Sequence, residues 1–183
     1  MSDSDSLTTS KPGPSAIVVS RYNDSITSVM LEGAVQAYLD AGGSQDTLAI
    51  LEAPGAYELI AIANAAASSG MYASVVCLGC VIRGETSHDQ HIANAVAVGL
   101  GEISIKTNVP VAFGVLTTNT IEQARERAGG SVGNKGAEAM NAVLGSEGAI
   151  NAINHAKQSN TPGMRYAPGF EVPDKAAHAG GGS

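Results

Sequence analysis

Short apolar runs alternate with longer segments of helical periodicity along most of the chain. Four runs rich in β-branched residues predict strands, at residues 16–20, 47–53, 74–82 and 109–116. Apolar residues recur at helical spacing between and after these runs, which predicts helices at residues 24–41, 57–69, 89–106, 120–128 and 135–156. This alternation predicts an α/β fold, in which helices cover both faces of a parallel sheet.

Polar residues and glycines supply the expected helix ends. Asn23 or Asp24 is the predicted cap of the first helix, which should stop at the glycine pair 42–43. Thr118 and Asn119 are the cap candidates for the fourth helix.

The two ends of the chain lack the alternation. Residues 1–15 are rich in Ser, Asp, Thr and Pro, and residues 158–183 are rich in Pro, Gly and Ala. We expect both to be flexible tails on either side of one domain, residues 16–157. That domain holds 7 of the 10 basic and 13 of the 17 acidic residues, so the acidic balance belongs to the folded body.

Charge and hydropathy exclude several classes of protein. The formal net charge of −7 argues against a nucleic-acid binder, which needs a clustered positive surface. No apolar run approaches the ~20 residues that span a bilayer, so we expect no membrane partner. The first residues lack the basic and apolar regions of a secretory signal, which makes a cytoplasmic location the default expectation.

Cys77 and Cys80 form a C-x-x-C motif inside one predicted strand. Positions three apart in a strand are separated by roughly 10 Å and point to opposite faces, too far for a disulfide. We therefore expect two small buried hydrophobic residues rather than a redox pair.

Chemistry is expected where the strands end, because α/β sheets bind ligands beyond the carboxyl ends of their strands. The segments at these ends are residues 20–23, 53–58, 83–88 and 117–119. Tyr22 and Tyr57 lie in them, and Phe113 lies late in the fourth strand run. The rings fit a flat apolar ligand, or each ring packs over its own loop.

The segment around Gly84 and Thr86 precedes the third helix, whose free N–H groups would favour a phosphate. Plain helix capping is the alternative interpretation. The segment lacks the glycine spacing of ATP-binding and NAD-binding loops, so neither nucleotide is expected. His88 is either a proton shuttle or a surface histidine. His91 follows one turn later, but without a third ligand no metal site is expected.

Basic residues are scarce in the domain, which draws attention to Arg125, Arg127 and Lys135. Their ordinary interpretation is helix charge compensation and solvated pairing with Glu122 and Glu126. Spacing alone leaves open whether Arg127 binds an anion.

Five motifs together resemble the 6,7-dimethyl-8-ribityllumazine synthase family, over about residues 15–155. They are Arg21-Tyr22-Asn23; Pro54-Gly55-Ala56-Tyr57-Glu58; the run from Gly79 to His88; Phe113-Gly114-Val115-Leu116; and the segment from Ala128 to Ala139. The resemblance implies a flavodoxin-like three-layer α/β/α sandwich with a four-stranded parallel sheet. It also implies homopentamers, often with twelve pentamers closed into an icosahedral capsid, and active sites between neighbouring subunits.

The resemblance further implies a transferase of riboflavin biosynthesis that needs no cofactor or metal. Such an enzyme condenses 5-amino-6-(D-ribitylamino)uracil with L-3,4-dihydroxybutan-2-one 4-phosphate to the lumazine, releasing phosphate and water in the penultimate step. Riboflavin synthase is then a candidate partner.

The residue roles carried over from the family fall into three groups. The pyrimidine and ribityl chain would be bound by Tyr22, Asn23, Ala56, Tyr57, Glu58, Cys80, Val81, Ile82, Lys135 and, from a neighbouring subunit, Phe113. The phosphate would be bound by Glu85, Thr86 and the neighbour's Arg127, and His88 would move protons.

Two departures from the family pattern stand out. Asp89-Gln90-His91 follows His88, where the family usually has an aromatic residue and then an acid. This leaves open which group orients the imidazole, with His91 as a candidate relay. Gly130-Ser131 replaces a Thr-Lys or Thr-Arg pair without an added insertion, which favours a full shell. The rival functions are a non-catalytic flavin- or lumazine-binding protein, a container shell, and a flavodoxin-like domain that uses FMN.

Overall fold

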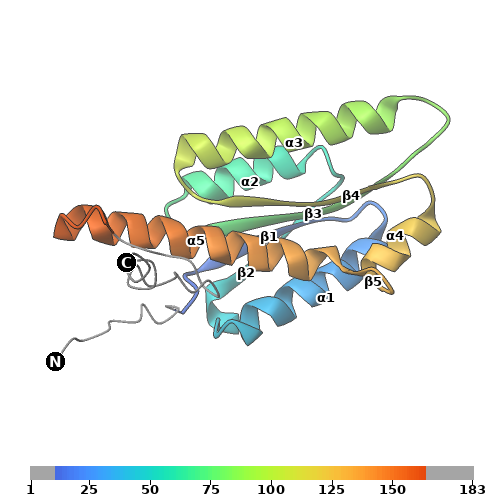
Figure 1. The fold of residues 1–183 in the computed structure, drawn as a ribbon. Helices are drawn as coiled ribbons and strands as arrows, with labels where there is room; N and C mark the ends of the chain where they lie inside the picture. The colour runs from blue at the N-terminus through green and yellow to red at the C-terminus, as the bar shows by residue number, and fades with distance from the viewer. Residues whose placement is uncertain (1–10, 164–183) are drawn as a thin grey trace, which may run out of the picture.

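The computed structural model describes residues 11–163, which form a sheet between two layers of helices (Figure 1). The strands are β1 (Ser15–Ser20), β2 (Leu48–Ala53), β3 (Ser74–Ile82) and β4 (Val111–Thr118). They are parallel and lie in the order β2-β1-β3-β4. The helices are α1 (Asp24–Asp40), α2 (Leu59–Ser68), α3 (His88–Thr107), α4 (Ile121–Arg127) and α5 (Lys135–Ser159), with a 3-10 turn η1 (Gln45–Thr47) before β2. The predicted three-layer α/β/α fold with a four-stranded parallel sheet is confirmed.

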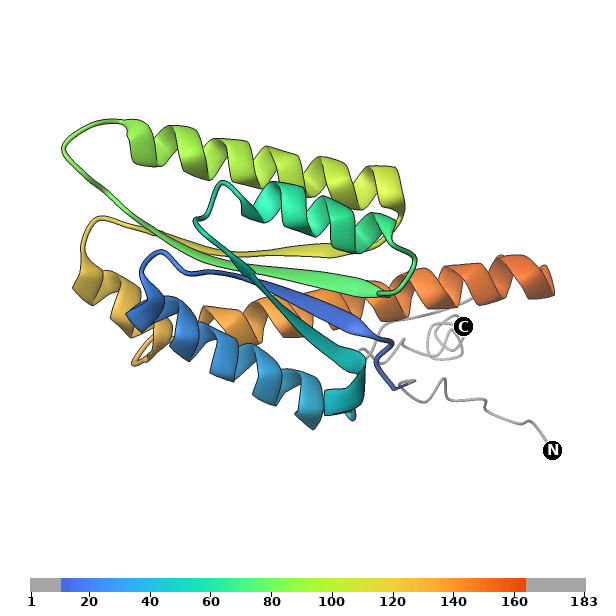
Figure 2. The ribbon, with the colours of Figure 1, turned by 180° about the vertical axis from the view of Figure 1, so that it is seen from behind.

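Two hydrophobic cores lie on opposite faces of the sheet. Helices α2 and α3 cover one face, and α1, α4 and α5 cover the other (Figures 1 and 2). Successive strand residues feed the two cores alternately, as Ile17 and Val18 do in β1. Cys77 and Cys80 likewise enter different cores, so the prediction that both are small buried residues is confirmed.

The sheet has a buried centre and two partly exposed edges. Strands β1 and β3 lie in the middle and are buried almost throughout, which explains their continuous apolar sequences. The edge strands expose Ile50 of β2 (49%) and Phe113 of β4 (40%). Because all four strands run the same way, the segments after Ser20, Ala53 and Ile82 meet at one end of the sheet.

The predicted boundaries are confirmed to within about three residues. Strand β4 begins at Val111 rather than Val109, since Pro110 has no N–H for the ladder; its carbonyl still accepts from the Val75 N–H at 3.0 Å. Phe113 therefore lies early in β4, not late. A short antiparallel hairpin, β5 (Ala128–Gly130) and β6 (Gly133–Asn134), was not predicted.

The predicted helix caps need correction. The Asn23 side chain does not cap α1; its amide instead donates to the Cys80 carbonyl oxygen at 2.9 Å. Thr120, rather than Thr118 or Asn119, caps α4, and its hydroxyl accepts from the Gln123 N–H at 3.3 Å.

The folded part extends beyond the predicted domain limits at both ends. Ser15 is already in β1, and α5 continues to Ser159. The Gly13 N–H donates to the Glu147 carboxylate at 2.8 Å, which ties the segment before β1 to α5. The rest of the predicted tails, residues 1–10 and 164–183, lies outside the described range. Between residues 11 and 163, none of the helices is both long and apolar enough to cross a membrane.

Candidate active site

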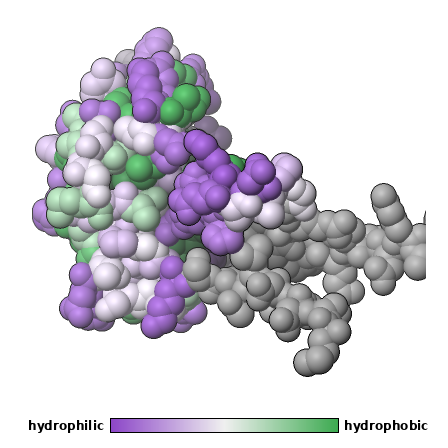
Figure 3. Space-filling model, turned by 90° about the vertical axis from the view of Figure 1, so that its left-hand side faces the viewer, coloured by the Kyte–Doolittle hydropathy of each residue, from purple (hydrophilic) through white to green (hydrophobic). Residues whose placement is uncertain are grey.

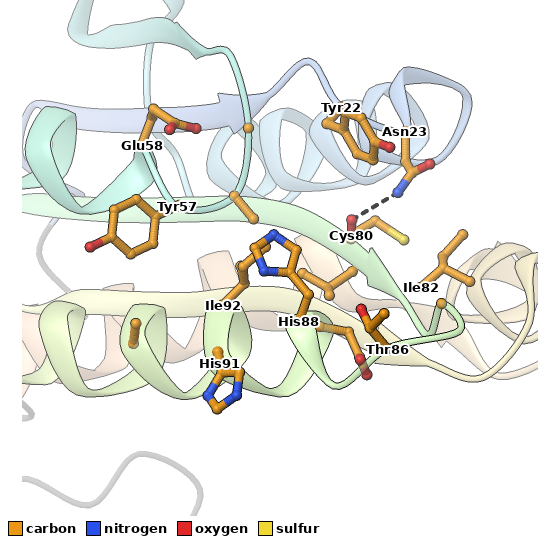
Figure 4. Close-up of a pocket in the computed structure, with 16 residues that line it drawn as sticks. Tyr22, Asn23, Tyr57, Glu58, Cys80, Ile82, Thr86, His88, His91 and Ile92 are labelled. Carbon is orange, nitrogen blue, oxygen red and sulfur yellow. Dashed lines mark hydrogen bonds between the residues drawn. The ribbon is translucent and has the colours of Figure 1, made fainter.

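A hollow of about 930 Å³ opens at the carboxyl ends of β1, β2 and β3 (Figure 4). Three loops and the first turns of α3 form its wall, which is where an α/β sheet is expected to bind a ligand. Its lining residues are Tyr22, Asn23, Gly55, Ala56, Tyr57, Glu58, Cys80, Val81, Ile82, Gly84, Thr86, His88, Asp89, His91, Ile92 and Ala95. Sequence segments that lie far apart in the chain are thus brought to one cavity.

Two aromatic rings border this hollow without being packed into the protein. Tyr22 is 71% exposed and Tyr57 is 57% exposed. Figure 4 shows them on opposite sides of the cavity, Tyr22 from the β1–α1 loop and Tyr57 from the β2–α2 loop. Such exposure argues against loop packing as the reason for either ring, and it leaves both faces available to a flat ligand.

Glu58 places a carboxylate beside the backbone of the β2–α2 loop. A Cβ at Gly55 would lie 2.8 Å from the Glu58 Oε2 atom, so a larger residue there would displace the carboxylate from this position. Within residues 11–163, Glu58 forms no ion pair, and its oxygens are free to accept hydrogen bonds from hydroxyl groups.

The imidazole of His88 points into the middle of the cavity, between Tyr57 and Cys80 (Figure 4). It stands at the first residue of α3, with Asp89 next to it on the cavity wall. The ring of His91 lies on the other side of the helix, away from the ring of His88 (Figure 4). His88 is therefore an accessible proton donor and acceptor, and the two rings do not form a direct relay.

The loop before α3 offers free hydrogen-bond donors. Ser87 is the N-cap residue of this 20-residue helix, but its hydroxyl makes no capping bond. Thr86 lines the cavity just before it. Since the first N–H groups of a helix have no intrahelical partners, a hydroxyl, backbone N–H groups and the helix dipole converge here on a position suited to an anion.

The model of the 6,7-dimethyl-8-ribityllumazine synthase family matches residues 14–150. The chain belongs to this family. Lumazine synthases are transferases of riboflavin biosynthesis, and the protein is such an enzyme. The matched range contains every strand of the sheet, every residue around the hollow and the first part of α5.

Four residues that the lumazine synthase resemblance assigns to the site lie outside this hollow. Phe113 is on the β4 edge, Glu85 is on the loop before α3, Arg127 ends α4, and Lys135 begins α5. One chain thus brings most of the expected pyrimidine-binding and proton-transfer residues together, but not these four.

The surroundings of the two basic residues differ. Arg127 forms no ion pair with any residue in the described range, and its Nη1 group donates to the Gln123 carbonyl at 3.1 Å. Its neighbour Glu126 accepts instead from the Ser131 hydroxyl at 2.6 Å and the Ser131 N–H at 2.9 Å. These bonds lower the pKa of Glu126. Lys135, by contrast, is paired with Glu138 at 2.6 Å, and not with Glu122 or Glu126, the partners of the ordinary interpretation.

The polar floor of the hollow is backbone at the end of β3. The Cys80 carbonyl is already engaged by Asn23, while Val81 and Ile82 border the cavity beside it. Burial raises the pKa of the Cys80 thiol to about 11, so this sulfur is no nucleophile at neutral pH.

Sequence reasoning missed two apolar lining residues, Ile92 and Ala95. Their spacing from His88, four and seven residues, is the spacing of one helix face, and this signal could have found them. Between residues 11 and 163 there is no group of three His, Cys, Asp or Glu side chains arranged to hold a metal ion.

Proposed function

We propose that the protein condenses 5-amino-6-(D-ribitylamino)uracil with L-3,4-dihydroxybutan-2-one 4-phosphate to 6,7-dimethyl-8-ribityllumazine, the penultimate step of riboflavin synthesis. The observation that carries this proposal is the hollow at the carboxyl ends of the strands. Tyr22, Glu58 and His88, given separate roles by the family resemblance, border this single cavity.

The pyrimidine substrate would lie between the two exposed rings. Tyr22 would stack on the heterocycle, and Ala56 and Tyr57 would follow the ribityl chain. Glu58 would accept hydrogen bonds from the ribityl hydroxyls, which a carboxylate does well. The backbone of Val81 and Ile82 would face the polar edge of the ring, where N–H and C=O groups discriminate the uracil pattern.

The phosphorylated ketone would bind at the start of α3. Thr86 and the free N–H groups of the helix would hold its phosphate, with Glu85 on the same loop and Arg127 from a second copy opposite. A phosphate held this way is anchored in the first step and stabilised as it leaves.

His88 would then transfer the protons that the chemistry needs. Imine formation, loss of phosphate and ring closure each require a proton to move, and one imidazole, which can both donate and accept a proton, can serve them in turn. Holding both reactants in one cavity supplies further acceleration by proximity.

The complete site would need two chains. Phe113 and Lys135 stand outside the hollow of their own chain, and Arg127 has no described partner for its charge. We propose that a neighbouring copy supplies these residues within a homopentamer, and that twelve pentamers close into a shell. A cytoplasmic location and a partnership with riboflavin synthase stay predictions from the sequence.

The decisive experiment mixes the two substrates with the purified protein. The appearance of lumazine fluorescence, with one phosphate released for each lumazine, is expected. Protein that binds lumazine or flavin but forms no product would be a binding or container protein. Purified protein carrying a redox-active yellow flavin would instead indicate a flavodoxin-like use of FMN. Light scattering should give a mass far above that of one chain, and a monomer at micromolar concentration would contradict the shared site.

A further inference from the structure

Asn23 has an unusual backbone for the residue that begins a helix. Its φ and ψ are 61° and 44°, in the left-handed region. The other non-glycine residues with positive φ between residues 11 and 163 are Asn108 and Asn160, which end α3 and α5. A left-handed residue is customary after a helix, whereas the residue before a helix is normally extended. Helix capping therefore does not explain the conformation of Asn23.

The side chain of Asn23 supplies the explanation. Its Nδ2 donates to the Cys80 carbonyl at 2.9 Å, across 57 residues of sequence (Figure 4). The ladder between β1 and β3 ends at the pair Val19 and Leu78, before Cys80. The hydrogen bond from the Asn23 amide thus joins the segment that follows β1 to β3, beyond the last paired residues of the two strands. The left-handed turn aims the amide at that carbonyl, and asparagine tolerates this backbone better than most residues.

The β1–α1 loop is consequently tied on both sides of Tyr22. On one side the Arg21 N–H donates to the Ala53 carbonyl of β2 at 2.8 Å. On the other side Asn23 holds Cys80 of β3. Because Tyr22 is 71% exposed, packing contributes little to its placement, and the ties on either side hold the backbone from which its ring projects.

We propose that Asn23 is a positioning residue for Tyr22 rather than a ligand of the substrate. It fixes the turn that presents the Tyr22 ring to the hollow, and its Nδ2 is engaged by the protein before any ligand arrives. This revises the substrate-binding role expected from the sequence. The kinetic part of its test rests on the proposed function, and a second readout does not.

The test compares Asn23→Gly in two backgrounds. Glycine keeps the left-handed turn accessible and removes only the amide. In the otherwise unchanged protein, the KM for the ribitylaminouracil should rise about fivefold to tenfold, with kcat changed less, as expected for loss of one hydrogen bond and looser ordering. In a Tyr22→Ala background the same change should alter KM by less than about twofold, because coupled residues are not additive.

The matched control is Asn108→Gly. Asn108 is also a left-handed asparagine, but it follows the far end of a 20-residue helix, about 30 Å from His88 by helix length. Its substitution should leave the KM unchanged. Asn23→Asp keeps the size and backbone tolerance of asparagine but cannot donate when ionised; it repeats the comparison if the glycine variant does not fold.

Hydrogen exchange of the backbone between residues 21 and 27 supplies the readout without substrate. Asn23→Gly should accelerate exchange there about tenfold, and Asn108→Gly should not. An equal rise in KM in both backgrounds would make Asn23 a direct ligand and overturn the proposal, as would unchanged exchange in this segment. If the unsubstituted protein makes no lumazine, the proposed function fails, and the exchange result alone decides the role of Asn23.

Discussion

Stability at alkaline pH should depend on the two buried thiols. Burial raises the pKa of Cys77 to about 12 and that of Cys80 to about 11, from an ordinary value of 9.0. Both thiols therefore stay protonated in the folded protein while those of the unfolded chain ionise. The free energy of unfolding is therefore unaffected by these thiols below pH 9 and falls as the pH rises from 9 towards 11–12. In that range ionisation stabilises only the unfolded state.

The size of the effect follows from the unfolded chain. At pH 10, the preferential ionisation of a thiol with pKa 9 in the unfolded chain lowers the free energy of unfolding by about 1 to 2 kcal/mol for each cysteine, or about 3 kcal/mol for both. At pH 8 the same calculation gives a negligible loss for the pair. The figure at pH 10 barely changes with the folded pKa, provided that this is about 11 or higher.

The assay is urea unfolding at pH 8 and pH 10, at one protein concentration and in the presence of a reductant. The chain has two cysteines, so Cys77→Ala/Cys80→Ala is a control without thiols. This variant should be less stable than the unsubstituted protein at pH 8 because it leaves small voids, and the difference between the two proteins should shrink at pH 10. The unsubstituted protein should lose about 2 to 3 kcal/mol more than the variant between the two pH values. Equal losses in the two proteins would refute the reasoning.

Three other predictions concern the shared site, helix packing and the segment before β1. His88→Ala should lower kcat by about one to three orders of magnitude, and Arg127→Ala should mainly raise the KM for the phosphorylated ketone. If two chains build each site, unfolding and co-assembling these two variants should restore part of the activity, and mixtures that stay inactive would contradict the sharing. Gly136→Ala would drive a Cβ into the Met30 carbonyl of α1 and should cost about 1 to 3 kcal/mol in denaturant unfolding. Gly145→Ala lies in open space on the same helix and should be neutral or slightly stabilising, because alanine has the higher helix propensity. A loss for Gly145→Ala as large as that for Gly136→Ala would contradict the role given to the Met30 contact. Glu147→Ala should cost about 1 to 2 kcal/mol because the half-buried Gly13 N–H loses its acceptor. Glu147→Gln keeps that acceptor and replaces an oxygen without a described partner, so its thermal midpoint should stay close to that of the unsubstituted protein.

The sheet could be predicted from the sequence because its cause is local. Strands β1 and β3 are buried on both faces, and burial of that kind requires continuous apolar runs such as residues 74–82. The position of the hollow could be predicted from the same pattern, since parallel strands bring their carboxyl ends together. Tyr22 and His88 could therefore be expected near one cavity before their contacts were known.

Sequence patterns failed to predict features that depend on a hydrogen-bond partner distant in the sequence, on a very short element or on a second chain. Asn23 could cap α1, and only the proximity of Cys80, 57 residues away, directs its amide elsewhere. The hairpin at 128–134 is too short for a periodicity to reveal. Phe113 could not be placed by any pattern within one chain, because its expected partner is a second copy.

Both ends of the described range, residues 11–163, lie at the end of the molecule opposite the hollow. Residues 11–14 lead into the amino end of β1, and α5 carries the chain away from its start near the hollow to Gly163 (Figure 1). Seen from this end, hydrophilic residues alternate with small apolar patches on the part of the surface formed by the described residues (Figure 3). The residues at the two ends of the described range therefore lie far from the chain's own cavity, and substitutions there leave the residues that line it untouched.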